Sequence, residues 1–140
     1  REYPMVSFDG KTQRLAVGTK DSVVVTYDLK TATRSHVLEG HRAAVEAVAF
    51  SDDGKTLASY SVGDAEVRLW HATSSFFGIL SSSPQCFRVV HVDEHAESAQ
   101  HALDALNVLQ AVRLVWTSHS TISLQRSWAG FLTLDMRTGK

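Results

Sequence analysis

An internal repeat with a period near 43 residues is the feature that most restricts how this chain can fold. Asp9-Gly10-Lys11-Thr12 recurs 44 residues later as Asp53-Gly54-Lys55-Thr56, and Leu15-Ala16 recurs 42 residues later as Leu57-Ala58. A period of this length is typical of repeat architectures, in which each unit buries its apolar surface against the next one. The 140 residues therefore form about three units of one repeated structure.

Each of the first two copies has the pattern of several short strands. The expected strands are residues 5–8, 14–17, 23–27 and 34–38 in the first copy, and 45–50, 56–59 and 66–70 in the second. Val6 and Phe8 are two residues apart, as are Val48 and Phe50, so each pair falls on one face of a strand. An Asp-Gly turn follows each pair and favours a hairpin. Four short antiparallel strands in about 43 residues indicate the blade of a β-propeller.

A third copy is more divergent. Residues 112–117, 121–125 and 131–135 fit the first three strands of a blade, with Leu134 at the position of Trp70. No fourth strand is predicted after residue 135. The predicted fold class is therefore all-β, a partial β-propeller of two blades and an incomplete third, with one short helical insert.

The helical insert is predicted between the second and third copies. Residues 72–85 form an extended serine-rich loop, and residues 86–92 fit the delayed fourth strand of the second blade. Apolar residues three or four apart in the stretch 93–111 predict a short amphipathic helix, whose leucines are Leu103, Leu106 and Leu109. Insertions in repeat proteins often lie at a binding face, so these leucines are candidate partner contacts.

These patterns divide the chain into four segments. We assign blade one to residues 1–38, blade two to residues 39–92, the helical insert to residues 93–111 and the incomplete blade three to residues 112–140. The chain begins at Arg1 without an initiator methionine, so it has the character of an excerpt. We therefore expect the remaining blades of a parent chain to be among its partners.

The second copy resembles a complete WD repeat. The motifs of that family follow one another in its order: Gly40-His41, Val48, Phe50-Ser51, Asp53-Gly54-Lys55, Leu57-Ala58-Ser59, Asp64 and Val67-Arg68-Leu69-Trp70. Two positions depart from the family pattern, because His71 replaces the usual aspartate and Asp64 lies one residue late. The resemblance implies a buried structural chain of hydrogen bonds among four side chains, which here are His41, Ser59, Asp64 and Trp70.

A serine, a histidine and an aspartate could also indicate nucleophilic catalysis. No oxyanion hole or nucleophile turn is evident beside them, so we interpret the set as structural. Gly10-Lys11-Thr12 and Gly54-Lys55-Thr56 resemble the end of a phosphate-binding loop, but the upstream glycine and the following helix are missing. The sequence therefore predicts neither an enzyme nor a bound cofactor.

A group of histidines and acids is a second candidate for chemistry. It contains His91, Asp93, Glu94, His95, Glu97 and His101. Imidazole and carboxylate groups bind zinc, but His95 and His101 are six residues apart and do not share a helix face well. We therefore favour a solvated polar segment over a metal site.

Composition removes several classes of partner. The sequence has 14 Lys and Arg residues and 15 Asp and Glu residues, so its net charge is −1. This charge gives no long-range attraction for nucleic acid or an anionic membrane. The stretch 72–87 is nearly uncharged, but its serines and Pro84 argue against a membrane span. Cys86 is the only cysteine and cannot form an intrachain disulfide, so a reducing compartment such as the cytoplasm is expected.

A narrower resemblance is to the carboxy-terminal region of the rabconnectin-3 beta family, the WD-repeat subunits of the rabconnectin complex. The runs that carry it include Tyr3–Phe8, Arg14–Gly18, Val25–Asp28, Leu57–Ser61 and Leu114–Ser118, with Tyr60-Ser61 in place of the usual Gly-Ser. The resemblance implies a non-catalytic scaffold that assembles or regulates the vesicular proton-pumping V-type ATPase. Its implied partners are the rabconnectin alpha subunit and V-ATPase subunits, through which it would reach vesicle or endosomal membranes. The alternatives are an unrelated WD-repeat scaffold in trafficking or signalling and, more remotely, a propeller enzyme whose active site lies in other blades.

Overall fold

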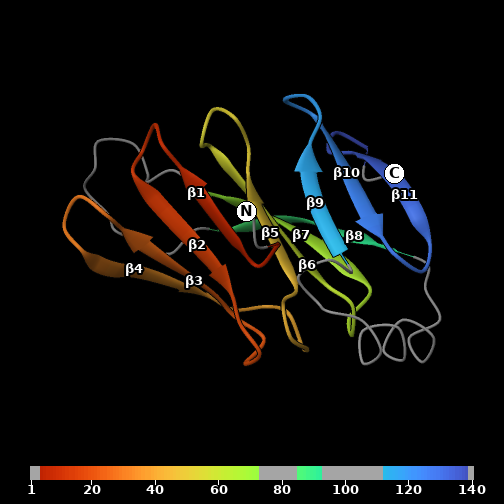
Figure 1. Ribbon diagram of the computed structural model, residues 1–140, viewed down its shortest axis with the longest axis horizontal. Coiled ribbons are helices and arrows are strands. Elements are labelled where there is room, and N and C mark those ends of the chain that lie inside the picture. Colours follow the sequence, from red (N-terminus) through yellow and green to blue (C-terminus); the bar gives the residue numbers. More distant parts are fainter. Residues whose placement is uncertain (1–3, 73–84, 93–111, 139–140) are drawn as a thin grey trace.

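The computed structural model describes residues 4–72, 85–92 and 112–138, which form three antiparallel sheets side by side (Figure 1). Sheet one contains β1 (Val6–Asp9), β2 (Arg14–Gly18), β3 (Val24–Asp28) and β4 (Thr33–Leu38). Sheet two contains β5 (Ala47–Phe50), β6 (Thr56–Ser61), β7 (Glu66–His71) and β8 (Cys86–His91). Sheet three contains β9 (Val112–Trp116), β10 (Thr121–Arg126) and β11 (Gly130–Asp135). The all-β fold class is confirmed, while the expected insert at 93–111 lies outside the described residues.

Within each sheet, strands that follow one another in sequence pair as neighbours. The order is β1-β2-β3-β4 in sheet one, β5-β6-β7-β8 in sheet two and β9-β10-β11 in sheet three. Most strand ends fall within one or two residues of the predicted ones. The strand expected at residues 45–50 begins instead at Ala47, because the Val45 N–H donates to the carbonyl oxygen of Thr19, 2.9 Å away in the segment that follows β2.

The alternation of side chains gives each sheet two faces. We call the face that carries Tyr27, Trp70 or Leu134 the front face, and the opposite one the back face. The back of sheet one packs against the front of sheet two in a cluster of Ala16, Val24, Leu38, Val45, Val48, Phe50, Leu57, Trp70 and Ala72. The back of sheet two packs against the front of sheet three in a second cluster, which includes Ala58, Tyr60, Leu69, Leu114, Ile122, Leu124 and Leu134. The same stacking of front on back thus occurs twice.

Polar groups also connect sheets one and two. Arg14 donates to the carbonyl oxygens of Gly54, at 3.0 Å, and of Ala72, while its guanidinium carbon lies 5.6 Å from the centre of the Phe50 ring. The Phe50 N–H donates to Ser7 Oγ at 3.0 Å. Burial lowers the pKa of Arg14, although the nearby carboxylates of Asp9 and Asp28 favour its charged form.

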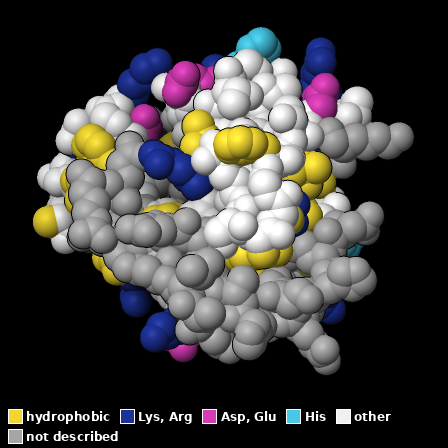
Figure 2. Space-filling model, turned by 45° about the vertical axis from the view of Figure 1, so that its right-hand side comes forward, with side chains coloured by type: hydrophobic (Ala, Val, Ile, Leu, Met, Phe, Trp, Pro, Cys, Tyr) yellow, Lys and Arg dark blue, Asp and Glu magenta, His cyan; other side chains and the backbone are white. Residues whose placement is uncertain are grey.

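Two sheet faces at the ends of the stack have no sheet packed against them in the described part of the chain. The front of sheet one carries Val6, Phe8 and Val37, which are 37%, 54% and 38% exposed. Where Figure 2 shows the surface, hydrophobic side chains form several small separate groups. None of the described elements is a helix with the length and apolar character required to span a bilayer.

Candidate functional site

The four side chains expected to form a polar chain lie together in sheet two. The Trp70 indole N–H donates to Ser59 Oγ at 2.9 Å, and Ser59 Oγ lies 2.7 Å from His41 Nε2. His41 Nδ1 lies 3.1 Å from Asp64 Oδ2, which also accepts the backbone N–H of Arg42 at 2.7 Å. The chain of hydrogen bonds runs without a break from an indole in the sheet to a carboxylate in a turn.

The local structure explains why these residues meet. Ser59 and Trp70 lie on the front face of neighbouring strands, β6 and β7, and Asp64 lies in the turn that joins them. His41 enters from the segment before β5, directly after Gly40. Gly40 has a φ of +154°, a backbone conformation that residues with a side chain rarely adopt, and a Cβ atom there would also lie 2.8 Å from Arg68 Nη1.

The hydrogen bonds fix the protonation of His41. The Asp64 carboxylate can only accept, so the imidazole proton lies on Nδ1 and is donated to Asp64. In the neutral ring Nε2 is then an acceptor and receives the Ser59 hydroxyl proton, while Ser59 Oγ accepts the indole N–H. Burial is the main cause that lowers the pKa of His41, and it outweighs the opposing effect of the hydrogen bond and charge of Asp64. The side chain of His41 has no exposed surface, and the neutral imidazole satisfies every bond in the chain.

The order serine, histidine, aspartate is also that of a nucleophile with its base and orienting group. Ser59 is 0% exposed, and its hydroxyl is occupied by Trp70 and His41. A substrate therefore has no path to this oxygen. The geometry favours a structural role, in which the chain ties the segment before β5 and the β6–β7 turn to the sheet.

Glu66 is a buried carboxylate that the sequence analysis did not single out. It lies at the start of β7, two residues before Arg68, whose Nη2 is 3.2 Å from its Oε1. Its Oε2 is 3.5 Å from His91 Nδ1 and 3.9 Å from Arg42 Nη2. The alternation of Glu66 and Arg68 along one strand was the available sequence signal, since opposite charges two residues apart share a face.

Glu66 also completes a group that could hold a metal ion. Ligand atoms of His41, Asp64 and Glu66 lie within 4.8 Å of one another. Arg42 and Arg68 are paired with these carboxylates, however, and the His41 Nδ1 proton is used by Asp64. The cationic neighbours already compensate the carboxylates, so the arrangement is an ion-pair network and supports no metal assignment.

The other expected groups are only partly within the described residues. His91, the first member of the histidine and acid group, ends β8 opposite Glu66, whereas its members from residue 93 onward lie outside the described residues. The predicted contact residues Leu103, Leu106 and Leu109 also lie outside them.

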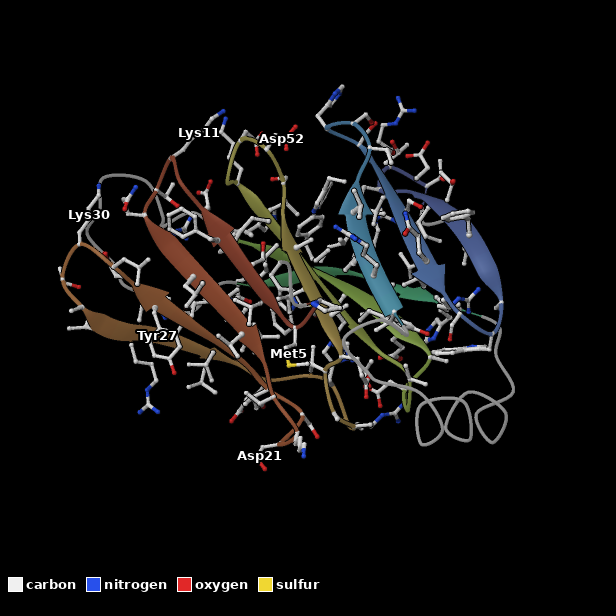
Figure 3. The ribbon with its side chains drawn as sticks, viewed as in Figure 1. Met5, Lys11, Asp21, Tyr27, Lys30 and Asp52 are labelled. Atoms are coloured by element: carbon white, nitrogen blue, oxygen red, sulfur yellow. The ribbon has the colours of Figure 1, made fainter. Side chains whose placement is uncertain are left out.

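The two turns that resemble a phosphate loop are filled by their own carboxylates. Asp9 accepts the backbone N–H and the hydroxyl of Thr12, and Asp53 accepts the Lys55 N–H at 2.9 Å. The Lys55 N–H is the main cause that lowers the pKa of Asp53. Lys11 and Asp52 mark these turns at one edge of the molecule, opposite Asp21 (Figure 3). The backbone N–H groups of Thr12 and Lys55 in these two turns already donate to carboxylates, which argues against an anion-binding site there.

Comparison with known proteins identifies one WD repeat in the chain and a similar fold. Residues 32–71 match the family described as WD domain, G-beta repeat. A stretch of 69 residues, 49% of the chain, is 39% identical to an uncharacterized WD repeat-containing protein of Synechocystis sp. and covers 19% of that protein. In structure the chain is similar to the β-propeller domain of Cps50 (Swd1) of Myceliophteria thermophila, with a TM-score of 0.64 and 22% identity, covering 97% of this chain and 35% of that one.

The stacked sheets and the solved propeller show the fold of a partial β-propeller, within which residues 32–71 match one WD repeat. The matched residues 32–71 contain the WD motifs that the sequence placed from Gly40 to Trp70. They also contain the hydrogen-bonded side chains from His41 to Trp70. The chain spans about a third of the solved propeller and its matched part about a fifth of the curated relative.

Proposed function

We propose that the chain is part of a non-catalytic protein–protein interaction scaffold that assembles or regulates the V-type ATPase. The observation that carries the first half of this proposal is the buried chain from Trp70 to Asp64, whose polar groups are all occupied within sheet two. WD-repeat propellers are generally non-catalytic scaffolds, because a rigid stack of sheets displays its turns and edges to other proteins. An arrangement whose buried polar groups are all occupied suits a scaffold that binds other proteins at its surface.

The V-ATPase assignment is supported by the resemblance to the rabconnectin-3 beta family. Two of the runs that carry it, Leu57–Ser61 and Leu114–Ser118, include core strands on either side of the second apolar cluster. Tyr60, which replaces the usual glycine of WD repeats, is 0% exposed in that cluster. The residues that resemble this family therefore include ones that shape the packing of sheet two on sheet three. The proposed partners are the rabconnectin alpha subunit and V-ATPase subunits.

For the contact element we propose the predicted amphipathic stretch with Leu103, Leu106 and Leu109. Closing a blade requires four strands and does not require an additional helix. A segment of this length is also marginal as an isolated helix in water. Apolar residues at helical spacing would then be available to a partner protein.

The test is affinity capture of the intact polypeptide from cell extract, scored for V-ATPase subunits and for vesicle acidification when the protein is depleted. We expect V-ATPase subunits to be captured and acidification to fall. Capture of trafficking or signalling proteins without V-ATPase subunits would instead favour an unrelated WD scaffold.

A matched pair of variants then tests the contact element. Replacing residues 98–109 with a Gly/Ser linker of equal length should reduce capture and leave thermal unfolding nearly unchanged. The control is Leu29→Ser, in the exposed turn after β3, which should change neither capture nor unfolding. Full capture with a lowered melting temperature would show that the stretch packs on its own propeller.

A further inference from the structure

The turn between the first and second strands of each sheet is held by a side-chain oxygen that accepts backbone N–H groups. In sheet one this acceptor is Asp9, whose carboxylate accepts the N–H groups of Lys11 and Thr12, two and three residues later. In sheet two it is Asp53, which accepts the Lys55 N–H two residues later. Two of the three sheets thus close this turn around a carboxylate.

Sheet three closes the same turn around a hydroxyl. Ser118 Oγ accepts the N–H of Ser120 at 3.2 Å and that of Thr121 at 3.1 Å, again two and three residues later. It also lies 2.7 Å from the hydroxyl oxygen of Thr121, just as the Asp9 carboxylate accepts the hydroxyl of Thr12. Ser118 therefore makes the contacts of the aspartate in sheet one without its negative charge.

The hydroxyl of Ser118 is also accessible to an enzyme. The β9–β10 turn projects at the same edge of the molecule as the β1–β2 and β5–β6 turns (Figure 1). Thr117, Ser118 and His119 are all exposed in it. Ser59, the hydroxyl at the centre of the polar chain, is by contrast 0% exposed. Of these two hydroxyls, only that of Ser118 can be reached by a protein that transfers a group to it.

A cation lies beside this turn. The Met136 N–H donates to the carbonyl oxygen of Ser120 at 2.7 Å, so Arg137 is one residue from the contact. The side chain of Arg137 is 76% exposed, and its guanidinium is paired with Asp135 at 3.1 Å. A phosphate ester carries a charge of about −1.5 to −2 at pH 7, more than the single charge of a carboxylate, so it competes effectively with Asp135 for this guanidinium.

We propose that Ser118 is a phosphorylation site, at which a protein kinase converts the neutral acceptor of this turn into a charged one. The kinase transfers the γ-phosphoryl group of ATP to Ser118. The bond from Oγ to phosphorus forms, the bond from the γ-phosphorus to the β–γ bridging oxygen breaks, ADP leaves, and the hydroxyl proton goes to the catalytic base of the kinase. The phosphate oxygens then accept the N–H groups of Ser120 and Thr121 and attract Arg137.

Mass spectrometry of the intact polypeptide, isolated from its native cells with phosphatases inhibited, tests the modification. We expect a phosphate that fragmentation assigns to Ser118 and that is lost in Ser118→Ala. The matched control Ser120→Ala, in the same turn, should keep it. Phosphate on Ser120 or Thr121 alone, a different group on Ser118, or an unmodified turn would overturn the proposal.

Hydrogen exchange tests where the phosphate lies. In the intact polypeptide with phosphoserine introduced at position 118, protection of the Ser120 and Thr121 amides should rise by about threefold to tenfold over the dephosphorylated protein, because hydrogen bonds to charged acceptors are stronger. Protection is measured against the unfolded chain that carries the same modification. Phosphoserine introduced at position 120 is the matched control and should not raise it.

Two outcomes of the exchange experiment would contradict the proposal. Unchanged protection with phosphoserine at 118 would show that the phosphate does not replace the hydroxyl as the acceptor of this turn. An equal rise from position 120 would show a general effect of charge. Neither measurement involves a V-ATPase subunit, so its failure is separate from a failure of the proposed function.

Discussion

The front faces of the three sheets carry different chemistry at the same positions. In sheet two these positions are Ser59 and Trp70, which the polar chain joins to His41 and Asp64. In sheet one they are Val17 and Tyr27, and in sheet three they are Leu124 and Leu134. The registers agree, since Val17 lies opposite Val6, Ser59 opposite Val48 and Leu124 opposite Leu114.

This difference distinguishes the features that form a blade from the hydrogen bonds that hold its loops in place. The first three strands have the same antiparallel pairing in all three sheets, although among the described residues only sheet two has the polar chain. The strand pattern and the turns are therefore sufficient for the sheet itself. The polar chain instead fixes the segment before β5 and the β6–β7 turn, at the cost of burying four polar side chains that depend on one another.

The largest expected effect is the loss of Trp70, which serves both the apolar cluster and the polar chain. Trp70→Ala should reduce the free energy of unfolding by about 3 to 5 kcal/mol, because it leaves a cavity between sheets one and two and removes the donor to Ser59. Tyr27→Ala, at the half-buried equivalent position in sheet one, is the matched control and should cost less. Denaturant unfolding of the intact polypeptide measures both. An unchanged midpoint for Trp70→Ala would mean that the assumed blade register is wrong.

A second substitution converts one position of sheet two to the residue found in sheet one. Ser59→Val removes the acceptor of the Trp70 N–H and the donor to His41 and leaves both groups buried without partners. We expect a loss of about 2 to 4 kcal/mol, since each stranded buried group costs about 1 to 3 kcal/mol. Ser59→Thr, which keeps the hydroxyl, should recover most of the loss. Equal stability of the valine and threonine variants would show that the polar chain contributes nothing.

The strands and the repeat were predictable from sequence because both depend on local patterns. Alternating apolar residues and Asp-Gly turns placed the described strands to within a few residues, and the WD pattern selected His41 and Trp70. Arg14 was not predicted as a connector of two sheets. Its acceptors are the backbone carbonyls of Gly54 and Ala72, 40 and 58 residues away, and a carbonyl has no signature in the sequence.

Two further features depend on contacts that a strand pattern does not reveal. The apolar pair Val6 and Phe8 was correctly placed on one face, but the pattern could not show that this face is uncovered. His71, which departs from the WD pattern, stacks its ring on Phe87, with centroids 4.2 Å apart. Phe87 lies in β8, 16 residues after His71, so the pairing of β7 with β8 had to be known first.

A third prediction concerns His41 itself. His41→Ala should cost about 1 to 3 kcal/mol, because it strands Ser59 and Asp64 in a buried site. His41→Gln retains a side chain that can hydrogen-bond and should cost less. A neutral result for the alanine variant in denaturant unfolding would indicate that water replaces the imidazole without loss.

The smallest expected effect is on the pH dependence of stability, and it distinguishes sheet two from the other sheets. The pKa of His41 is lowered in the folded protein by burial, while in the unfolded chain it returns to about 6.5. The unfolded state therefore binds the proton first, so stability falls as pH decreases below about 6.5 and levels off once the pH is below the folded pKa. Neither Val17 nor Leu124 has a titrating partner of this kind. As the pH is lowered, protection from hydrogen exchange should therefore be lost first in β6 and β7.

His41→Gln should remove this part of the pH dependence while the other six histidines remain as the internal control. An identical pH profile for the wild-type chain and the glutamine variant would contradict a neutral, buried His41.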